Sequence, residues 1–188
     1  MKNPCLVIID VQEKLFPVMN DRQTLLKNLI ILIKGFQLFK LPVIITEQVP
    51  EKLGNTIEEI ACLFDTVDPV VKSSFSCLGE SKFLERLEVI NADEIILAGI
   101  ESHVCVYQTS HDLLEKNKHV EVVVDSISSR NINNHNTAIA RMKMEGVILT
   151  FVVFFGGSFG VSSVLLNRNA HLHKTTSIGR VHNRTLLD

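Results

Sequence analysis

The feature that most constrains the fold is a series of short, wholly apolar runs that alternate with longer segments of helical periodicity. The first run, residues 5–9, is unbroken and ends at Asp10. Strands that are buried on both faces have this pattern, and such strands belong to parallel sheets covered by helices. Similar runs predict further strands at residues 42–46, 69–71, 94–98, 119–124 and 147–150.

The segments between these runs predict helices. In residues 20–39, leucine, isoleucine and phenylalanine recur at spacings of three and four residues, which is the pattern of an amphipathic helix. Asn20 or Asp21 stands where a helix cap is expected. Residues 46–65 predict a loop with one helical turn near 57–63. The other helices are expected at residues 80–89, 103–117 and 133–145.

This alternation predicts an α/β fold, a doubly wound, Rossmann-like parallel sheet with helices on both faces. A length of 188 residues suits one domain, which we place at residues 1–166. Ligand sites in such folds lie outside the carboxyl ends of the strands. The residues to examine therefore follow the predicted strands: Asp10, Thr46, Glu47, Lys72, residues 99–105 and Asp125.

The end of the chain departs from this pattern. Residues 146–187 contain no Asp or Glu, and residues 151–155 are apolar without a helical polar face. We treat 167–188 as an atypical tail that is disordered, packs on another subunit or reflects a changed reading frame. One edge strand buries too little of this apolar run, so we expect a homo-oligomer. The alternative is a last buried strand extended by a few residues.

Composition narrows the class of function. The chain has 19 basic and 21 acidic residues, whereas dedicated nucleic-acid binders usually have a basic excess. Its longest uncharged apolar run, residues 147–155, is shorter than the about 20 residues that a bilayer requires. No signal-peptide core follows Met1, and the four cysteines form no CxxC pair. We therefore expect a cytoplasmic protein with reduced thiols and a small-molecule substrate, and neither nucleic acid nor a membrane as partner.

Three residues near the predicted strand ends form a candidate catalytic centre: Asp10, Lys72 and Cys105. A cysteine attacks as its thiolate, which is scarce at neutral pH because the ordinary thiol pKa is about 8.5. A position in the first turn of a helix and the positive charge of Lys72 both predict a lowered pKa for Cys105. Asp10 would accept the thiol proton. Each of these residue types alone is also common in a structural role. The hypothesis of a catalytic centre therefore rests on the three residues together.

Three segments resemble the isochorismatase-like cysteine hydrolase family. They are residues 7–12 (Val-Ile-Ile-Asp-Val-Gln), 71–75 (Val-Lys-Ser-Ser-Phe) and 99–106 (Gly-Ile-Glu-Ser-His-Val-Cys-Val), in the family's order and spacing. The resemblance covers roughly residues 4–150 and implies the family's doubly wound α/β fold. It also implies a catalytic triad in which Cys105 is the nucleophile, Asp10 the acid/base and Lys72 the third member.

The resemblance implies further features around the nucleophile. A non-proline cis peptide maps to the bond between Ile100 and Glu101, and the N–H groups of Glu101 and Cys105 then form an oxyanion hole. His103 stands at the helix start, where it would shape the mouth of the substrate pocket. Gln12, Phe16 and Phe75 follow strand ends and are candidates to line that pocket, although the two phenylalanines fit the core equally well.

The sequence departs from the family's nicotinamidase branch, which binds a metal through an Asp-x-His-x-x-His pattern after the second strand. Residues 46–54 contain no His, so we expect no catalytic metal and no other cofactor, and nicotinamide is a less suitable substrate. His103 and Cys105 are fewer ligands than a zinc site needs. Because true isochorismatases need no cysteine, Cys105 indicates acyl transfer on an amide or related C–N bond through a thioester.

Two function classes remain open. The leading hypothesis is a metal-independent cysteine hydrolase, and the alternative is a non-catalytic interaction protein that keeps the fold and the pocket. A low-pKa Cys105 that is alkylated before the other thiols would favour the enzyme. A flavodoxin-like nucleotide binder is disfavoured, because residues 10–14 stand where a Gly-rich loop would be needed.

Overall fold

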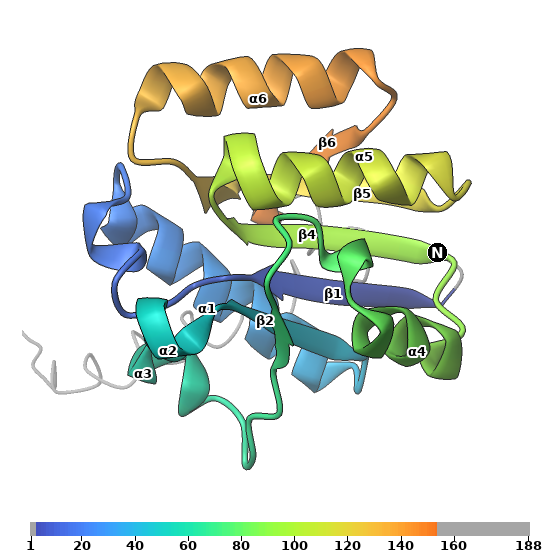
Figure 1. Ribbon diagram of the computed structural model, residues 1–188, viewed down its shortest axis with the longest axis horizontal. Coiled ribbons are helices and arrows are strands. Elements are labelled where there is room, and N and C mark those ends of the chain that lie inside the picture. The colour runs from blue at the N-terminus through green and yellow to red at the C-terminus, as the bar shows by residue number, and fades with distance from the viewer. Residues whose placement is uncertain (1–2, 154–188) are drawn as a thin grey trace, which may run out of the picture. The chain divides into compact units, whose positions relative to one another are not determined.

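The computed structural model describes residues 3–153, which form a parallel sheet between two layers of helices (Figure 1). The described strands make one six-stranded sheet in the order β3-β2-β1-β4-β5-β6, and every neighbouring pair is parallel. The predicted doubly wound α/β fold is therefore confirmed. The strands are β1 (Pro4–Ile9), β2 (Val43–Gln48), β3 (Val70–Lys72), β4 (Glu94–Ile100), β5 (His119–Ser128) and β6 (Ile148–Thr150).

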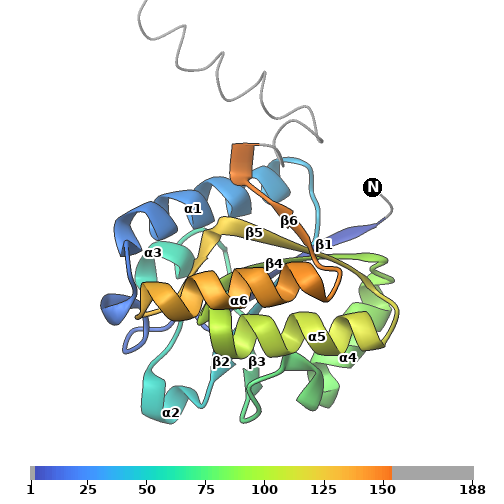
Figure 2. The ribbon, with the colours of Figure 1, turned by 90° about the horizontal axis from the view of Figure 1, so that it is seen from above.

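Within the described residues, α1 (Arg22–Leu38) covers one face of the sheet, and α4 (Ser81–Ile90), α5 (Tyr107–Glu115) and α6 (Ile132–Met144) cover the other (Figure 2). Successive strands are added outward from β1 in one direction and from β4 in the other. The strand order thus reverses between β1 and β4, and ligands bind beside such a switch point. Shorter helical segments are η1 (Phe16–Val18), α2 (Pro50–Leu53), α3 (Glu58–Ala61), η2 (Cys77–Gly79) and the π-helical η3 (Ser102–Val106).

The centre of the sheet is apolar on both faces because β1 alternates its side chains between two hydrophobic layers. All six residues of β1 are buried. Cys5, Val7 and Ile9 join the core cluster, and Leu6 and Ile8 point to the opposite face, which α1 covers. Each aliphatic side chain that is fully buried contributes about 1.5–3 kcal/mol. This packing holds the carboxyl end of β1 rigidly in place.

Several element boundaries differ from the sequence-based expectation. The predicted loop at 46–65 contains α2 and α3. β5 continues to Ser128 through a register shift opposite residues 97–99 of β4. Asp125 therefore lies inside β5 rather than after it, and the expectation that it follows a strand end is wrong. Its carbonyl accepts a 2.7 Å hydrogen bond from Asn28 Nδ2 of α1, so Asp125 helps to hold that helix on the sheet.

The described part of the chain ends shortly after β6. Because β6 ends at Thr150, the alternative in which the apolar run extends this strand is wrong for the residues up to Val153. The predicted domain boundary at 166 and the tail at 167–188 lie outside the described residues. No helix of residues 3–153 is long and apolar enough to cross a membrane.

Candidate active site

Asp10 follows β1 directly and is completely buried. Its backbone has a positive φ of 53°, and its N–H donates to the carbonyl of Thr46 at 3.2 Å. The hydroxyl of Thr46 donates to Asp10 Oδ1 at 2.7 Å. The end of β2 therefore fixes both the backbone and one carboxylate oxygen of Asp10.

Gly99 allows β4 to pass close to the end of β1. It has a φ of +114°, and a Cβ atom there would overlap the backbone of Ile9. Glycine tolerates this conformation because it has no side chain to clash. The close approach brings the turn after β4 next to Asp10.

Lys72 ends β3 and is almost completely buried. Its Nζ lies 2.6 Å from Asp10 Oδ2 and donates to Gln48 Oε1 at 2.7 Å. It also donates to the carbonyls of Ser74 at 3.2 Å and Phe75 at 3.1 Å. Burial is the largest single effect and lowers the pKa of Lys72, but the charge and hydrogen bond of Asp10 together with the charges of Cys105 and Cys77 raise it by more in total, so this pKa lies above its ordinary value. Lys72 is thus held as a buried cation with a full set of partners.

Cys105 is the fourth residue of η3, which follows β4, and is 6% exposed. Burial and the nearby charge of Asp10 raise the pKa of its thiol well above the ordinary value, and Lys72 offsets this only in part. The lowered pKa expected from the sequence is therefore wrong, because removal from water outweighs the lysine. Asp10 Oδ2 makes no hydrogen bond of good geometry, so it retains a lone pair for a proton despite the charge contact with Lys72.

The peptide bond between Ile100 and Glu101 is cis. The carbonyl of Glu101 accepts the N–H groups of Val104 at 3.1 Å and Val106 at 3.2 Å, and this begins η3. No hydrogen bond among residues 3–153 uses the Glu101 N–H. This donor is therefore available in the turn that leads to Cys105.

Arg130 holds the side chain of Glu101. Its backbone N–H donates to Glu101 Oε2 at 3.0 Å, and its Nε and Nη2 donate to Oε1 at 3.0 and 2.8 Å. Burial is the largest single effect and raises the pKa of Glu101, but these hydrogen bonds and the charges of Arg130 and His103 together lower it by more, so this pKa lies below its ordinary value and the carboxylate stays ionised. The segment after β5 thus braces the turn before Cys105.

The side chain of Gln12, a predicted pocket residue, is fully buried and committed to the backbone. Its Nε2 donates to the carbonyls of Gln48 at 3.1 Å and Gly54 at 2.6 Å, and its Oε1 accepts the Gln48 N–H at 2.8 Å. Gln12 therefore ties the segment after β1 to the end of β2 and has no free amide group for a substrate.

The other three predicted pocket residues have different surroundings. Phe16 lines a groove of 530 Å³ together with Arg22 and Ile57, and no triad residue lines that groove. Phe75 is 54% exposed, and its carbonyl binds Lys72. His103 is partly exposed and hydrogen-bonds through Nδ1 to Ser129 Oγ at 2.9 Å. Phe75 and His103 lie within three residues of Lys72 and Cys105 in the sequence, whereas Phe16 lies six residues after Asp10.

Sequence reasoning missed several supporting residues. Thr46 was singled out only as a strand-end residue, and nothing in the local sequence indicated that Gln48 or Arg130 supports the site. Cys77 is a second buried thiol near Asp10. Burial, more than the nearby charge of Asp10, raises the pKa of Cys77 to about 12, which suits an unreactive thiol.

Residues 46–54, at the end of β2 and just after it, do not fit a metal. Oε1 of Glu47, a buried residue of β2, accepts the N–H and the hydroxyl of Thr56, both at 2.7 Å. This acid therefore holds the segment before α3 in place. With Oε1 of Glu47 occupied and no His in residues 46–54, this stretch lacks the three ligands that a catalytic zinc site usually has.

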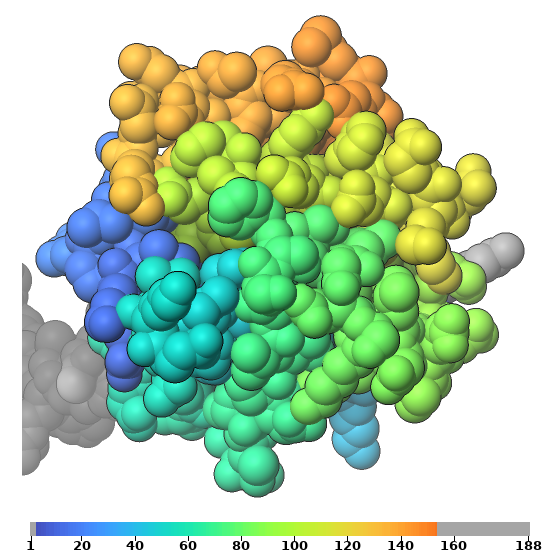
Figure 3. Space-filling view, viewed as in Figure 1, coloured from blue at the N-terminus to red at the C-terminus, as the bar shows by residue number. Residues whose placement is uncertain are grey.

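The four segments that carry the site meet on one side of the molecule. In the space-filling view (Figure 3), the segments after β1 (blue), β2 (cyan), β3 (green) and β4 (yellow-green) adjoin one another at the surface. Asp10, Lys72 and Cys105 are all buried, and they belong to the ends of β1 and β3 and to the turn after β4. The arrangement combines a thiol, a carboxylate and a buried cation, and these groups could support nucleophilic catalysis.

Known proteins share this sequence pattern and this architecture. The family model described as "Isochorismatase domain" matches residues 4–151. "Isochorismatase domain-containing protein 2" of Danio rerio is 32% identical over 148 residues, which cover 79% of this chain and 74% of that protein. The solved structure described as "MAR1 Ribonuclease from Caenorhabditis elegans" has a TM-score of 0.78 and 30% identity over 98% of this chain and 97% of that chain.

A more distant structure shares the fold alone. The YcaC gene product of Escherichia coli, described as an octameric hydrolase of unknown specificity, has a TM-score of 0.76 and 23% identity. The match covers 89% of this chain and 83% of that chain.

Proposed function

This chain belongs to the isochorismatase domain family, and from that premise we propose that it is a metal-independent cysteine hydrolase acting on a small amide or related C–N bond. The observation that carries the proposal is the buried ion pair of Asp10 and Lys72, 2.6 Å apart, beside the thiol of Cys105. Burying two charges is costly, and a hydrolase gains from this pair because it places a proton acceptor next to a nucleophile.

In the proposed reaction, Asp10 accepts the Cys105 proton as the sulfur attacks the substrate carbonyl. The raised pKa of the thiol favours transfer of this proton during the attack over a standing thiolate. Collapse of the intermediate breaks the C–N bond, Asp10 returns the proton to the leaving amine, and a thioester remains. Asp10 then removes a proton from water, and hydrolysis of the thioester releases the acid and restores the thiol.

The remaining groups have positioning and electrostatic roles in this proposal. Lys72 keeps Asp10 in place and offsets its charge. The free N–H of Glu101, together with that of Cys105, would stabilise the developing oxyanion, and Arg130 would hold the Glu101 turn in position. His103 and Phe75 would border the substrate at the surface.

The test is ammonia or amine release from a panel of small amides by the full-length chain. We expect Cys105→Ala to abolish release, and Cys62→Ala, at an exposed free thiol, to leave it unchanged. Acid quenching followed by mass spectrometry should detect an acyl group on the peptide that contains Cys105. Equal turnover by Cys105→Ala, or an acyl group elsewhere, would contradict the mechanism. No turnover across the panel would favour the non-catalytic alternative.

Cleavage of RNA is a separate question, because the Caenorhabditis elegans structure is described as a ribonuclease. The near balance of charge in this chain, with a formal net charge of −2, disfavours tight binding to a phosphate backbone. We expect no RNA cleavage by the purified chain, and cleavage that disappears in Cys105→Ala would overturn this expectation.

The proposed setting is a homo-oligomer in the cytoplasm with a small molecule as substrate. The free state of Cys5, Cys62, Cys77 and Cys105 suits a reducing compartment, where disulfides are rare.

A further inference from the structure

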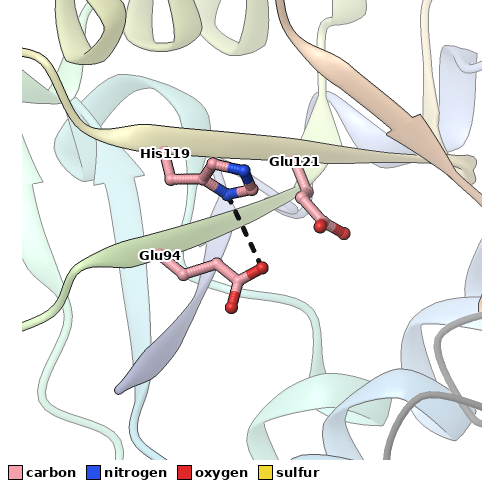
Figure 4. Close-up of side chains that lie close together, drawn as sticks. All are labelled: Glu94, His119 and Glu121. Atoms are coloured by element: carbon pink, nitrogen blue, oxygen red, sulfur yellow. Dashed lines mark ion pairs between the residues drawn. The ribbon is translucent and has the colours of Figure 1, made fainter. Parts of the chain in front are cut away.

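A second group of functional side chains lies at the other end of the strands. Glu94 opens β4 and His119 opens β5, and the two residues are partners in the strand register. Glu121 lies two residues after His119, so both point to the same face of the sheet. Figure 4 shows the three side chains converging, and a ligand atom of each lies within 4.8 Å of those of the other two.

Glu94 is the most buried member of this group. The residue is 6% exposed, whereas His119 is exposed and Glu121 is partly exposed. His119 Nδ1 lies 3.6 Å from Glu94 Oε1. Burying a carboxylate is costly unless its charge is balanced, and a cation bound among the three side chains would balance it.

The second carboxylate adds negative charge to the group. Glu94 and Glu121 lie close together, and two carboxylates that share a site repel each other when both are ionised. Among residues 3–153, no Lys or Arg forms an ion pair with either acid. A divalent cation between the two carboxylates would neutralise both.

We propose that Glu94, His119 and Glu121 bind a divalent transition-metal ion, for which Zn²⁺ is the matching probe. Two carboxylates balance a charge of +2, and the imidazole favours zinc over magnesium and calcium, which prefer oxygen ligands only. Zinc bonds to nitrogen and oxygen are about 2.0–2.2 Å long. The three side chains must therefore draw together around the ion, and the exposure of His119 and the partial exposure of Glu121 permit this.

This site is separate from the proposed catalytic centre. Strand residues rise by about 3.3 Å each, and β4 spans residues 94–100 between Glu94 and the turn that carries Cys105. The site is therefore about 20 Å from the nucleophile along the strand. Metal binding here would join the starts of β4 and β5 and stabilise the fold, whether or not the chain is a hydrolase.

The experiment uses the full-length chain, freed of metal by a chelator and titrated with Zn²⁺ by calorimetry, with thermal unfolding in parallel. We expect one ion per chain at this site and a melting temperature that rises with Zn²⁺ concentration. His119→Ala and Glu121→Gln should each weaken binding by about tenfold or more. Both residues are at least partly exposed, so these variants should fold even if Glu94→Gln does not.

Two controls isolate the site. His111→Ala removes another exposed histidine that contacts a glutamate, with His111 Nδ1 3.1 Å from Glu145 Oε2, and should bind Zn²⁺ like the wild type. The second control is a triple variant in which His171, His173 and His182, the histidines outside the described residues, are replaced by alanine. This variant should still bind one Zn²⁺ ion per chain. Absence of binding in the triple variant, or unchanged affinity in both His119→Ala and Glu121→Gln, would overturn the proposal.

Discussion

At the scale of single residues, the chemistry of Cys105 depends on two opposite charges placed beside it. Asp10 raises the pKa of the thiol and Lys72 lowers it, while burial adds the largest upward shift. A thiol in this environment is protonated at neutral pH and reacts only when a base takes its proton. We therefore expect the two charged neighbours to have separable effects on the reactivity of the thiol and on the proposed turnover.

The first prediction concerns alkylation of the resting thiol by iodoacetamide, with exposed Cys62 as an internal reference. Because only the thiolate reacts, Cys105 should react more slowly than Cys62 at neutral pH and accelerate as the pH rises. Asp10→Asn removes a charge that raises the pKa, so it should accelerate the reaction. Lys72→Met removes a charge that lowers the pKa, so it should slow the reaction. Peptide mass spectrometry over time measures these rates, and the opposite order of the two variants would refute the assignment.

The second prediction concerns turnover by Asp10→Asn. This variant should alkylate faster but hydrolyse amides about 10²–10⁴-fold more slowly, because general acid–base catalysis contributes a factor of that size. Steady-state kinetics on any substrate found in the panel measures the effect. A loss below about tenfold, roughly 1.4 kcal/mol of barrier, would mean that Asp10 is not the proton carrier.

At the scale of elements, the junction of β1 and β4 decides whether the site can form. Gly99 lets the two strands approach, and Arg130 braces the turn that follows β4 through Glu101. The geometry of the proposed triad thus depends on backbone contacts between elements as much as on its own side chains.

The third prediction compares two glycine substitutions. Gly99→Ala forces a Cβ onto the backbone of Ile9 at a positive φ, and should lower the free energy of unfolding by about 3 kcal/mol or more. Gly35→Ala lies inside α1, where a Cβ meets no atom within 4 Å, and should raise it by about 0.5–1 kcal/mol. Urea denaturation measures both, and equal effects of the two variants would contradict the proposed role of Gly99.

At the scale of the whole molecule, apolar side chains on the described surface favour self-association. Val71, on the edge strand β3, is 50% exposed, and Phe75 just after it is 54% exposed. Both lie beside the proposed active site. A shared interface there would cover apolar surface and enclose the substrate.

The fourth prediction is that the chain is at least a dimer. Sedimentation or light scattering at micromolar concentration should give a mass above the 21.1 kDa of one chain. Val71→Lys should lower that mass if β3 is part of the interface. A mass of one chain that stays constant as concentration rises would exclude the oligomer.

The sequence by itself determined the fold class and the family. Unbroken runs of apolar residues indicate buried strands, because both faces of a central parallel strand are covered by helices and must be apolar. Asp10 and Lys72 were identified because they stand at the ends of such runs. The family assignment came from three short segments and is confirmed over residues 4–151. The roles of the triad, the oxyanion donors and the pocket residues stay predictions.

Only the tertiary structure decided the strand order, the continuation of β5 past Asp125 and the burial of Gln12, because each depends on partners distant in the sequence. The raised pKa of Cys105 also depends on residues that are distant in the sequence. The sequence shows which charges exist, but the depth of the thiol and its place between Asp10 and Lys72 follow from the packing of β1, β3 and β4. The convergence of Glu94, His119 and Glu121 also had no local signal, since the register between two parallel strands is set by the packing of the whole sheet.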